Sequence, residues 1–250
     1  MIYEIENKKV IAISKNEKIE LPEDLKQKIV ENFENILKSG ANVWNGEVRC
    51  VAKNDVGEDT VELICKNSDY AHYLYGERIG LPEEYSCKNL SAGSLVETSD
   101  NFYIIGELDK TTSYPGMLQV PGGNIDPKDI VDENINIMAT IKRETLEELN
   151  IDLDDASKVI ESKIKYLYIS EPDEQPGVEV FTKVKLNMSK KELQQYFEEY
   201  YKYLKNNNLE VEFGTLHFLK KENALKELED LENPKRKYLT HLIKADMENI

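Results

Sequence analysis

The stretch R-E-T-L-E-E at residues 143–148 begins twenty residues after the glycine pair at 122–123. At 100° per residue of an α-helix, Glu144, Glu147 and Glu148 fall within an arc of roughly 100°. The pattern therefore predicts a helix that carries three carboxylates on one side. Arg143 lies beside Glu147 at i,i+4 spacing on the same helix.

The other side of this helix carries a mostly apolar stripe, made of Met138, Ile141, Thr145, Leu146 and Leu149. We expect the stripe to pack on a core while the acids face outward together. Three like charges so close repel one another unless a cation lies among them, and oxygen ligands of this kind suit Mg²⁺ or Mn²⁺. A solvated helix face is the plainer alternative in a chain with 48 acidic residues.

The residues before this helix predict a strand and a loop. The run L-Q-V-P-G-G at 118–123 reads as a short strand that closes on two glycines, where the backbone can approach another group closely. Asp126 and Pro127 then fit an N-cap and a first helical position. A loop followed by a carboxylate helix would hold a metal ion and a pyrophosphate together.

These residues resemble the signature of the Nudix hydrolase superfamily, G-x5-E-x7-R-E-U-x-E-E-x-G-U, in which U is aliphatic. Its positions are matched by Gly123, Arg143, Glu144, Glu147, Glu148 and Ile151, and loosely by Thr145. Asp129 stands where the first glutamate is expected, but thirteen residues instead of seven separate it from Arg143. Asn150 replaces the second glycine, and asparagine tolerates the left-handed conformation that ends helices.

The resemblance implies an α/β/α sandwich with a mixed sheet, and metal-dependent cleavage of nucleoside diphosphates linked to another moiety. By the same resemblance Glu144, Glu147 and Glu148 are metal ligands, and Gly123 offers a backbone carbonyl ligand. Arg143 orients the acids. An acid outside the signature serves as the base or a further ligand in many such enzymes, and we place Glu179 first and Glu212 second.

Further stretches are similar to the branch of this superfamily that cleaves UDP-glucose to UMP and glucose 1-phosphate. Residues 90–109 resemble the first hairpin of the fold, with a turn at 96–102. That branch has an N-terminal extension with a tryptophan and an aromatic Ser/Thr-x-Tyr segment, to which Trp44 and residues 68–73 would correspond. Cleavage of ADP-ribose or a related compound is one alternative. An inactive nucleotide-binding module is another, because the signature is enlarged.

The first 88 residues are expected to form a small α+β segment before a hydrolase domain at 89–250. In this segment the patterns predict strands within 2–13, a helix at 23–38, and a hairpin of 48–52 and 61–65. After the signature they predict strands at 159–170, 178–186 and 210–219, and helices at 189–205, 225–231 and 235–247. The acidic loop 171–177 is expected to border the substrate pocket, or to be an ordinary exposed loop.

Composition limits the classes of function. A net charge of −16 argues against a nucleic-acid or anionic-membrane surface. The resemblance implies that the partner is a small nucleotide substrate. No apolar run is long enough to span a membrane, and the N-terminus lacks a basic signal-peptide region. Cys50, Cys65 and Cys87 have no C-x-x-C spacing, which favours reduced thiols in a cytoplasmic setting. The three histidines stand far apart and are not expected to bind metal.

Overall fold

The computed structural model describes residues 1–40, 43–171 and 176–248, and its centre is one mixed β-sheet of 13 strands. The strands are β1 (Ile2–Glu4), β2 (Lys9–Lys18), β3 (Glu47–Val56), β4 (Thr60–Asp69), β5 (Asn89–Glu97), β6 (Phe102–Leu108), β7 (Leu118–Gln119), β8 (Gly122–Asn124), β9 (Ile130–Val131), β10 (Asn134–Ile135), β11 (Val159–Ile169), β12 (Gly177–Leu186) and β13 (Phe213–Lys220). The main path runs β1-β11-β12-β5-β3-β4-β2-β10-β9, and β8, β6, β7 and β13 branch from it through β5.

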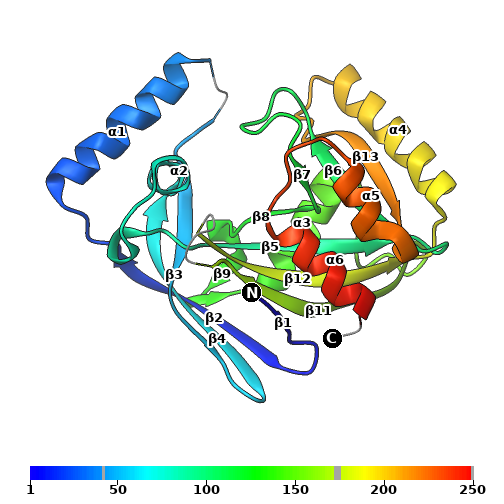
Figure 1. Ribbon diagram of the computed structural model, residues 1–250, viewed down its shortest axis with the longest axis horizontal. Coiled ribbons are helices and arrows are strands. Elements are labelled where there is room, and N and C mark those ends of the chain that lie inside the picture. The colour runs from blue at the N-terminus through cyan, green and yellow to red at the C-terminus, as the bar shows by residue number, and fades with distance from the viewer. Residues whose placement is uncertain (41–42, 172–175, 249–250) are drawn as a thin grey trace.

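Helices cover both faces of the sheet (Figure 1). The α-helices are α1 (Glu23–Lys38), α2 (Tyr70–Ile79), α3 (Ile137–Leu149), α4 (Lys190–Asn206), α5 (Ala224–Asp230) and α6 (Tyr238–Glu248), and the 3₁₀ turns are η1 (Glu83–Tyr85), η2 (Pro127–Asp129) and η3 (Lys221–Asn223).

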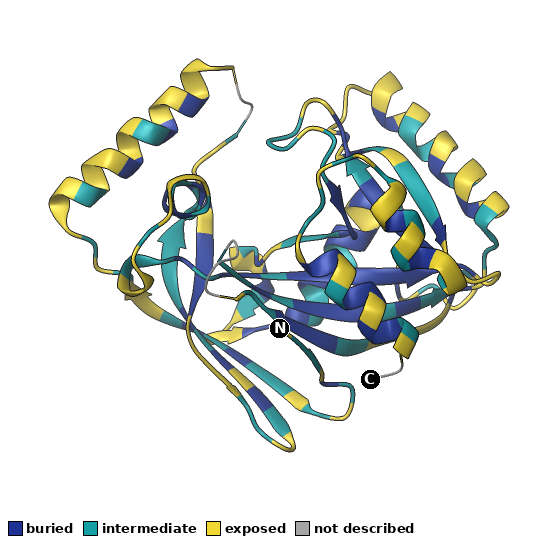
Figure 2. Ribbon diagram, in the orientation of Figure 1, coloured by how far each residue is buried: buried dark blue, intermediate teal, exposed yellow. Residues whose placement is uncertain are grey.

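Two hydrophobic cores lie on opposite faces of the central strands. Side chains of α3 and α4 share one core with Leu167 and Val180, whereas side chains of α5 and α6 share the other with Tyr168 and Phe181. Consecutive strand residues thus point to different cores, as the two-residue period of a strand requires. The result is the predicted α/β/α layering around a mixed sheet. Figure 2 shows the buried strands between the two layers of helices.

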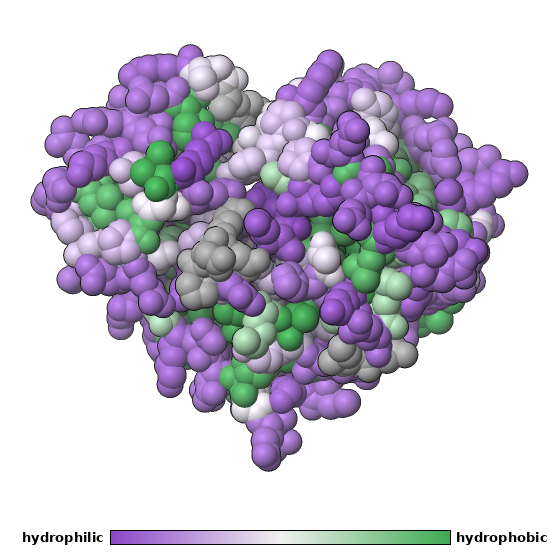
Figure 3. Space-filling model, viewed as in Figure 1, coloured by the Kyte–Doolittle hydropathy of each residue, from purple (hydrophilic) through white to green (hydrophobic). Residues whose placement is uncertain are grey.

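Strands of the N-terminal segment pair with the strands of the central sheet and extend it. β3 pairs with β5 at Cys50 and Asn89, β2 pairs with β10, and β1 pairs with β11. The predicted helix α1 has the expected bounds and packs on α2 through Ile29, Phe33 and Ile36. Apolar residues of this segment are visible on the left of Figure 3, on a face that is otherwise mostly hydrophilic. The boundary at residue 88 stays a prediction.

The predicted hairpin at 90–109 exists, but its two strands separate. β5 and β6 pair at Glu97 and Tyr103, after which β5 runs parallel to β12 and β6 runs antiparallel to β13. Most residues of β5 are buried, which is typical of a central strand with both faces covered. β5 therefore supplies the floor on which the glycine loop lies, because β8 also pairs with it.

The expectation of three reduced cysteines is wrong for two of them. Cys50 on β3 and Cys87, two residues before β5, form a disulfide, and Cys65 is a free, buried thiol. Pairing of β3 with β5 brings these cysteines together, which their spacing in the sequence does not reveal. The cytoplasmic setting, argued from reduced thiols, therefore loses that support.

Most other predicted elements are present with bounds shifted by a few residues. The capping box of Ser189 and Glu192 opens α4, and Asn150 ends α3 in the left-handed conformation with φ of 57°. Asp126 and Pro127 start η2, and Asn136 caps α3 itself. Residues 172–175 of the predicted acidic loop lie outside the described residues. No described helix combines the length and apolar character needed to cross a bilayer.

Candidate active site

Helix α3 presents its acids differently from the sequence prediction. Glu144 is 8% exposed and Glu148 is 3% exposed, whereas Leu146 is 45% exposed. The expected outward position of these acids and the burial of Leu146 are therefore wrong. The buried side of the helix combines Ile141, Glu144, Thr145, Glu148 and Leu149, so apolar packing and two carboxylates share one face.

The glycine pair explains how two glutamates enter the interior. The Gly122 N–H donates to Glu148 Oε2 at 2.7 Å. A Cβ atom on Gly123 would lie 2.5 Å from Glu144 Oε1, and one on Gly122 would lie 2.5 Å from the carbonyl oxygen of Ala92. No larger residue fits at either position without moving the backbone or the acid. The loop and the helix are thus in direct contact, as the strand, loop and helix order predicts.

A third acid completes a cluster with the two buried ones. Glu212 directly precedes β13, and one carboxylate oxygen from each of Glu144, Glu148 and Glu212 lies within 4.8 Å of the others. Glu148 Oε1 is buried and has no hydrogen-bond partner among the described residues. Three oxygen donors and an unpartnered buried oxygen fit a hard divalent cation such as Mg²⁺ or Mn²⁺. We call these three residues the carboxylate trio.

Glu147 lies outside the carboxylate trio. Its side chain is exposed on α3 and accepts a hydrogen bond from Arg143 Nη1 at 3.4 Å. The Cα–Cβ bonds of neighbouring helix residues point about 100° apart, so the Glu147 side chain leaves the helix in a different direction from the buried Glu148 side chain. The roles as metal ligands of Glu147 and of the Gly123 carbonyl stay predictions.

Arg143 holds the acids of this region in place. It donates to Glu144 Oε1 at 2.5 Å, to Asp129 Oδ2 at 3.1 Å and to the carbonyl oxygen of Asn124 at 3.2 Å. Asp129 is buried and also accepts from Thr140 Oγ1 at 2.8 Å. Asp129 therefore contacts Arg143 even though the enlarged loop separates the two residues by a longer stretch of sequence.

Electrostatics in the carboxylate trio disfavour three separate negative charges. Burial raises the pKa of Glu144, although the charge of Arg143 opposes the shift. Burial and the nearby acids raise the pKa of Glu148 well above its ordinary value. The pKa of Glu212 is raised to about 7 by burial of its carboxyl group and by the charge of Glu144. Such a cluster takes up protons or a cation near neutral pH.

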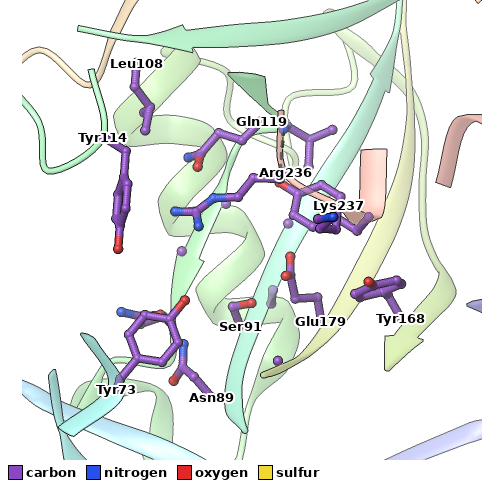
Figure 4. A pocket seen from close by; sticks show the side chains of 18 of the residues that line it. Tyr73, Asn89, Ser91, Leu108, Tyr114, Gln119, Tyr168, Glu179, Arg236 and Lys237 are labelled. Atoms are coloured by element: carbon purple, nitrogen blue, oxygen red, sulfur yellow. Dashed lines mark hydrogen bonds between the residues drawn. The ribbon is translucent and has the colours of Figure 1, made fainter. Parts of the chain in front are cut away.

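The carboxylate trio borders a pocket of about 210 Å³. Glu212, Gly122 and Gly123 line the end next to the trio. The rest of the wall is rich in aromatic and amide side chains, and Figure 4 shows Tyr73, Tyr114, Gln119 and Arg236 directed toward its interior. The pocket therefore offers a hydrophobic, hydrogen-bonding space beside a cluster suited to metal.

Glu179 faces the pocket from β12 but is not a member of the carboxylate trio (Figure 4). Burial raises its pKa to about 8, and the charge of Arg236 opposes this shift only in part. An acid with this pKa is largely neutral at pH 7 and can donate a hydrogen bond as well as accept one. Its predicted role as the catalytic base stays a prediction.

The N-terminal segment contributes to the same pocket. Tyr70 and Tyr73 of α2 belong to its wall, within the stretch matched to an aromatic segment. Trp44, matched to the tryptophan of that branch, is 78% exposed and is not among the pocket residues. His72 is buried and bonded to Ser68 and to the Tyr85 carbonyl, so it does not join the trio.

Sequence reasoning missed Tyr114 and Arg236. Arg236 lies between Lys235 and Lys237 in a short basic run after Pro234, and Tyr114 lies in a loop with other polar residues, so neither belongs to a recognised signature. Their importance comes from tertiary contacts: the Arg236 guanidinium lies 4.8 Å from the centre of the Tyr114 ring. Only the aromatic–proline–glycine character of residues 114–116 hinted at a special loop.

Comparison with known proteins gives a likeness to solved structures only. No protein-family model matches the chain, and no curated protein matches it either. A Nudix hydrolase from Alicyclobacillus acidocaldarius is 14% identical with a TM-score of 0.42, covering 64% of this chain and 90% of that one. A C. elegans Ap4A hydrolase is 18% identical with a TM-score of 0.38, covering 64% and 98%. Because these values are low, we infer function from the residues of the site.

Proposed function

We propose that this protein is a metal-dependent pyrophosphatase that acts on a nucleoside diphosphate linked to another moiety. The observation that carries the proposal is the convergence of Glu144, Glu148 and Glu212 within 4.8 Å beside the glycine loop. The resemblance of residues 122–151 to the Nudix signature supports the same reaction. The pocket next to the trio provides space for the ligand.

The residues have separate roles in this proposal. Glu144, Glu148 and Glu212 would hold the divalent cation, with Glu147 and the Gly123 carbonyl as further candidate ligands. When bound, such a cation neutralises phosphate oxygens and makes a water molecule acidic enough to attack near neutral pH. Arg143 fixes the orientation of Glu144 through its 2.5 Å hydrogen bond. Glu179 in its ionised form, which becomes more populated as the pH approaches its pKa of about 8, would accept the proton released by the attacking water. Glu212 would do so if it is not bound to the cation.

The substrate we favour is a UDP-sugar such as UDP-glucose, cleaved to UMP and sugar 1-phosphate. The placement of Tyr70 and Tyr73 in the pocket supports this choice, because these residues lie in the segment that resembles the UDP-glucose branch. ADP-ribose and related compounds are the alternative substrates within the same chemistry.

A substrate panel tests the proposal. Purified protein with Mg²⁺ or Mn²⁺ is incubated with UDP-glucose, other nucleotide sugars and ADP-ribose, and release of nucleoside monophosphate and sugar phosphate is measured. We expect cleavage that requires the metal and that Glu148→Gln lowers by roughly 10²- to 10³-fold. Glu199→Gln, on the exposed side of α4, is the matched control for an acid-to-amide change. Tight nucleotide binding without cleavage, at every pH and with both metals, would contradict the proposed enzyme and favour a nucleotide-binding module.

A further inference from the structure

The pocket has to accommodate negative charge in a strongly acidic protein. The chain carries a net charge of −16, and Glu179 and Glu212 are both exposed to the pocket. Among the described residues that line the pocket, only Arg236 and Lys237 are basic. Within the described part of the pocket wall, phosphate oxygens that do not reach the carboxylate trio therefore find positive charge at Arg236 and Lys237.

Arg236 is held in position for such a contact. Its guanidinium carbon lies 4.8 Å from the centre of the Tyr114 ring, and its Nη1 donates to Glu77 Oε1 at 3.4 Å. The Tyr114 hydroxyl donates to the same Glu77 carboxylate. A guanidinium stacked on a ring keeps its plane fixed while its edge remains able to donate paired hydrogen bonds to a phosphate. Lys237 is exposed and lacks comparable support.

The neighbouring acid does not cancel this positive charge near neutral pH. Glu179 faces Arg236 across the pocket, and burial raises its pKa to about 8. At pH 7 the carboxyl group is therefore mostly uncharged. The hydrogen bond from Arg236 Nη1 to Glu77 Oε1 is long, at 3.4 Å.

We infer that Arg236 binds a phosphate group of the substrate, the one farther from Glu144, Glu148 and Glu212, and that Glu77 and Tyr114 position it. The inference rests on the proposed function only in the identity of that substrate. It also gives the N-terminal segment a role, because Glu77 belongs to α2 and reaches across to a residue that precedes α6. Arg236 is then a substrate-binding residue, and Glu77 and Tyr114 are positioning residues.

Binding of inorganic pyrophosphate without metal isolates this contact. Calorimetric titration in EDTA is carried out at pH 7 on the wild-type chain, Arg236→Ala, Glu77→Gln and Tyr114→Phe. Loss of charge-assisted hydrogen bonds predicts an affinity at least roughly tenfold weaker for Arg236→Ala. Smaller, severalfold losses are expected for Glu77→Gln and Tyr114→Phe, because the arginine remains but is held less firmly.

Arg78→Ala is the matched control. Arg78 also lies over the Tyr114 ring, at 5.8 Å, but it is exposed on α2 and does not line the pocket. We expect this variant to bind pyrophosphate as the wild type does. Thermal unfolding of every variant reports whether the fold is retained, and Arg236→Lys, which keeps the charge, replaces Arg236→Ala if the latter does not fold.

Parallel hydrolysis assays with Mg²⁺ separate the two proposals. Equal pyrophosphate affinity of folded Arg236→Ala and wild type would overturn the inference, and so would an equal loss in Arg78→Ala. If the wild type cleaves a nucleotide sugar while Arg236→Ala binds normally, the proposed function stands and the role of Arg236 fails. Binding that depends on Arg236 without any cleavage would support the phosphate contact and reject the enzyme.

Discussion

Two groups of acidic side chains on opposite faces of the sheet differ in how much positive charge surrounds them. Among the described residues, only one of the three acids in the carboxylate trio has an ion pair, which joins Glu144 to Arg143. Glu97 and Asp246, on the opposite side of the sheet, share contacts with several lysines instead. We call the second group the lysine network.

The lysine network satisfies its acids fully. Lys183 Nζ lies 2.7 Å from both Glu97 and Asp246, and Lys221 Nζ lies 3.0 Å and 3.2 Å from them. Tyr103 also donates to Asp246 at 2.6 Å. Burial opposes ionisation of Glu97, but the nearby lysines lower its pKa to about 2. Burial likewise opposes ionisation of Asp246, and the lysines and tyrosine lower its pKa below the ordinary value.

The comparison separates structure from function. Acids whose pKa is lowered by matched partners stabilise the fold, because the ionised carboxylate is more stable in the folded protein than in the unfolded chain. Acids whose pKa is raised destabilise the fold near neutral pH unless a proton or a cation joins them. The carboxylate trio is therefore a site that a bound proton or cation would stabilise. The lysine network instead connects α6 to β12 through Asp246 and Lys183.

The largest effect is expected in the lysine network. Asp246→Ala removes the carboxylate that faces Lys183 and leaves a buried cation with one acidic partner fewer. Breaking a buried ion pair in this way costs about 3–5 kcal/mol of folding free energy. Urea unfolding followed by circular dichroism measures the change. A loss below about 1 kcal/mol would contradict the claim that the lysine network stabilises the fold.

The carboxylate trio should show the opposite behaviour. Glu148→Gln removes a metal ligand and is expected to lower kcat by roughly 10²- to 10³-fold, the usual size of a lost transition-state stabiliser. Without metal its free energy of unfolding at pH 7 should equal or exceed that of the wild type, because a raised-pKa acid is replaced by a neutral amide. Steady-state kinetics and urea unfolding in EDTA measure the two properties. Full activity of Glu148→Gln, or a loss of activity that accompanies a large loss of stability, would contradict this assignment.

These expectations show how far the sequence alone reaches. The Gly122–Gly123 loop, the helix with Glu144 and Glu148, and the αL end at Asn150 could be predicted, because each depends on local spacing and conformation. The rotation of α3 could not, because the carboxylates and the aliphatic residues compete for one buried face and the loop contact with Glu148 decides the outcome. Arg236 and the Cys50–Cys87 disulfide depend on contacts between distant segments.

Glu179 gives a smaller, pH-dependent effect. Its pKa in the folded protein is about 8, compared with an ordinary value of 4.5, so the folded state holds the proton more tightly. Raising the pH from 5 to 9 therefore removes stability from the wild type as it passes through this window. The charge of Arg236 acts on this carboxyl in the opposite direction to burial. Glu179→Gln should lose less stability over the same range. Urea unfolding at several pH values measures this difference, and the same loss of unfolding free energy in both proteins would contradict the raised pKa of Glu179.

The smallest effect is expected at Leu146. This side chain is 45% exposed, so Leu146→Asp should change the free energy of unfolding by no more than about 0.5 kcal/mol. Leu149→Ala, three residues along the same helix and fully buried, should cost about 2–5 kcal/mol. Urea unfolding of both variants tests the rotation of α3. A large loss of unfolding free energy in Leu146→Asp would instead support the helix orientation that the apolar stripe predicted.

Direct metal binding tests the central claim most closely. Mg²⁺ is titrated by calorimetry into the wild type, Glu148→Gln and the surface control Glu199→Gln, each freed of metal beforehand. We expect saturable binding to the wild type and to the control, and binding at least roughly tenfold weaker in Glu148→Gln, as loss of one charged ligand predicts. Identical isotherms for all three proteins, or no binding to the wild type, would contradict the assignment of Glu144, Glu148 and Glu212 as a metal site.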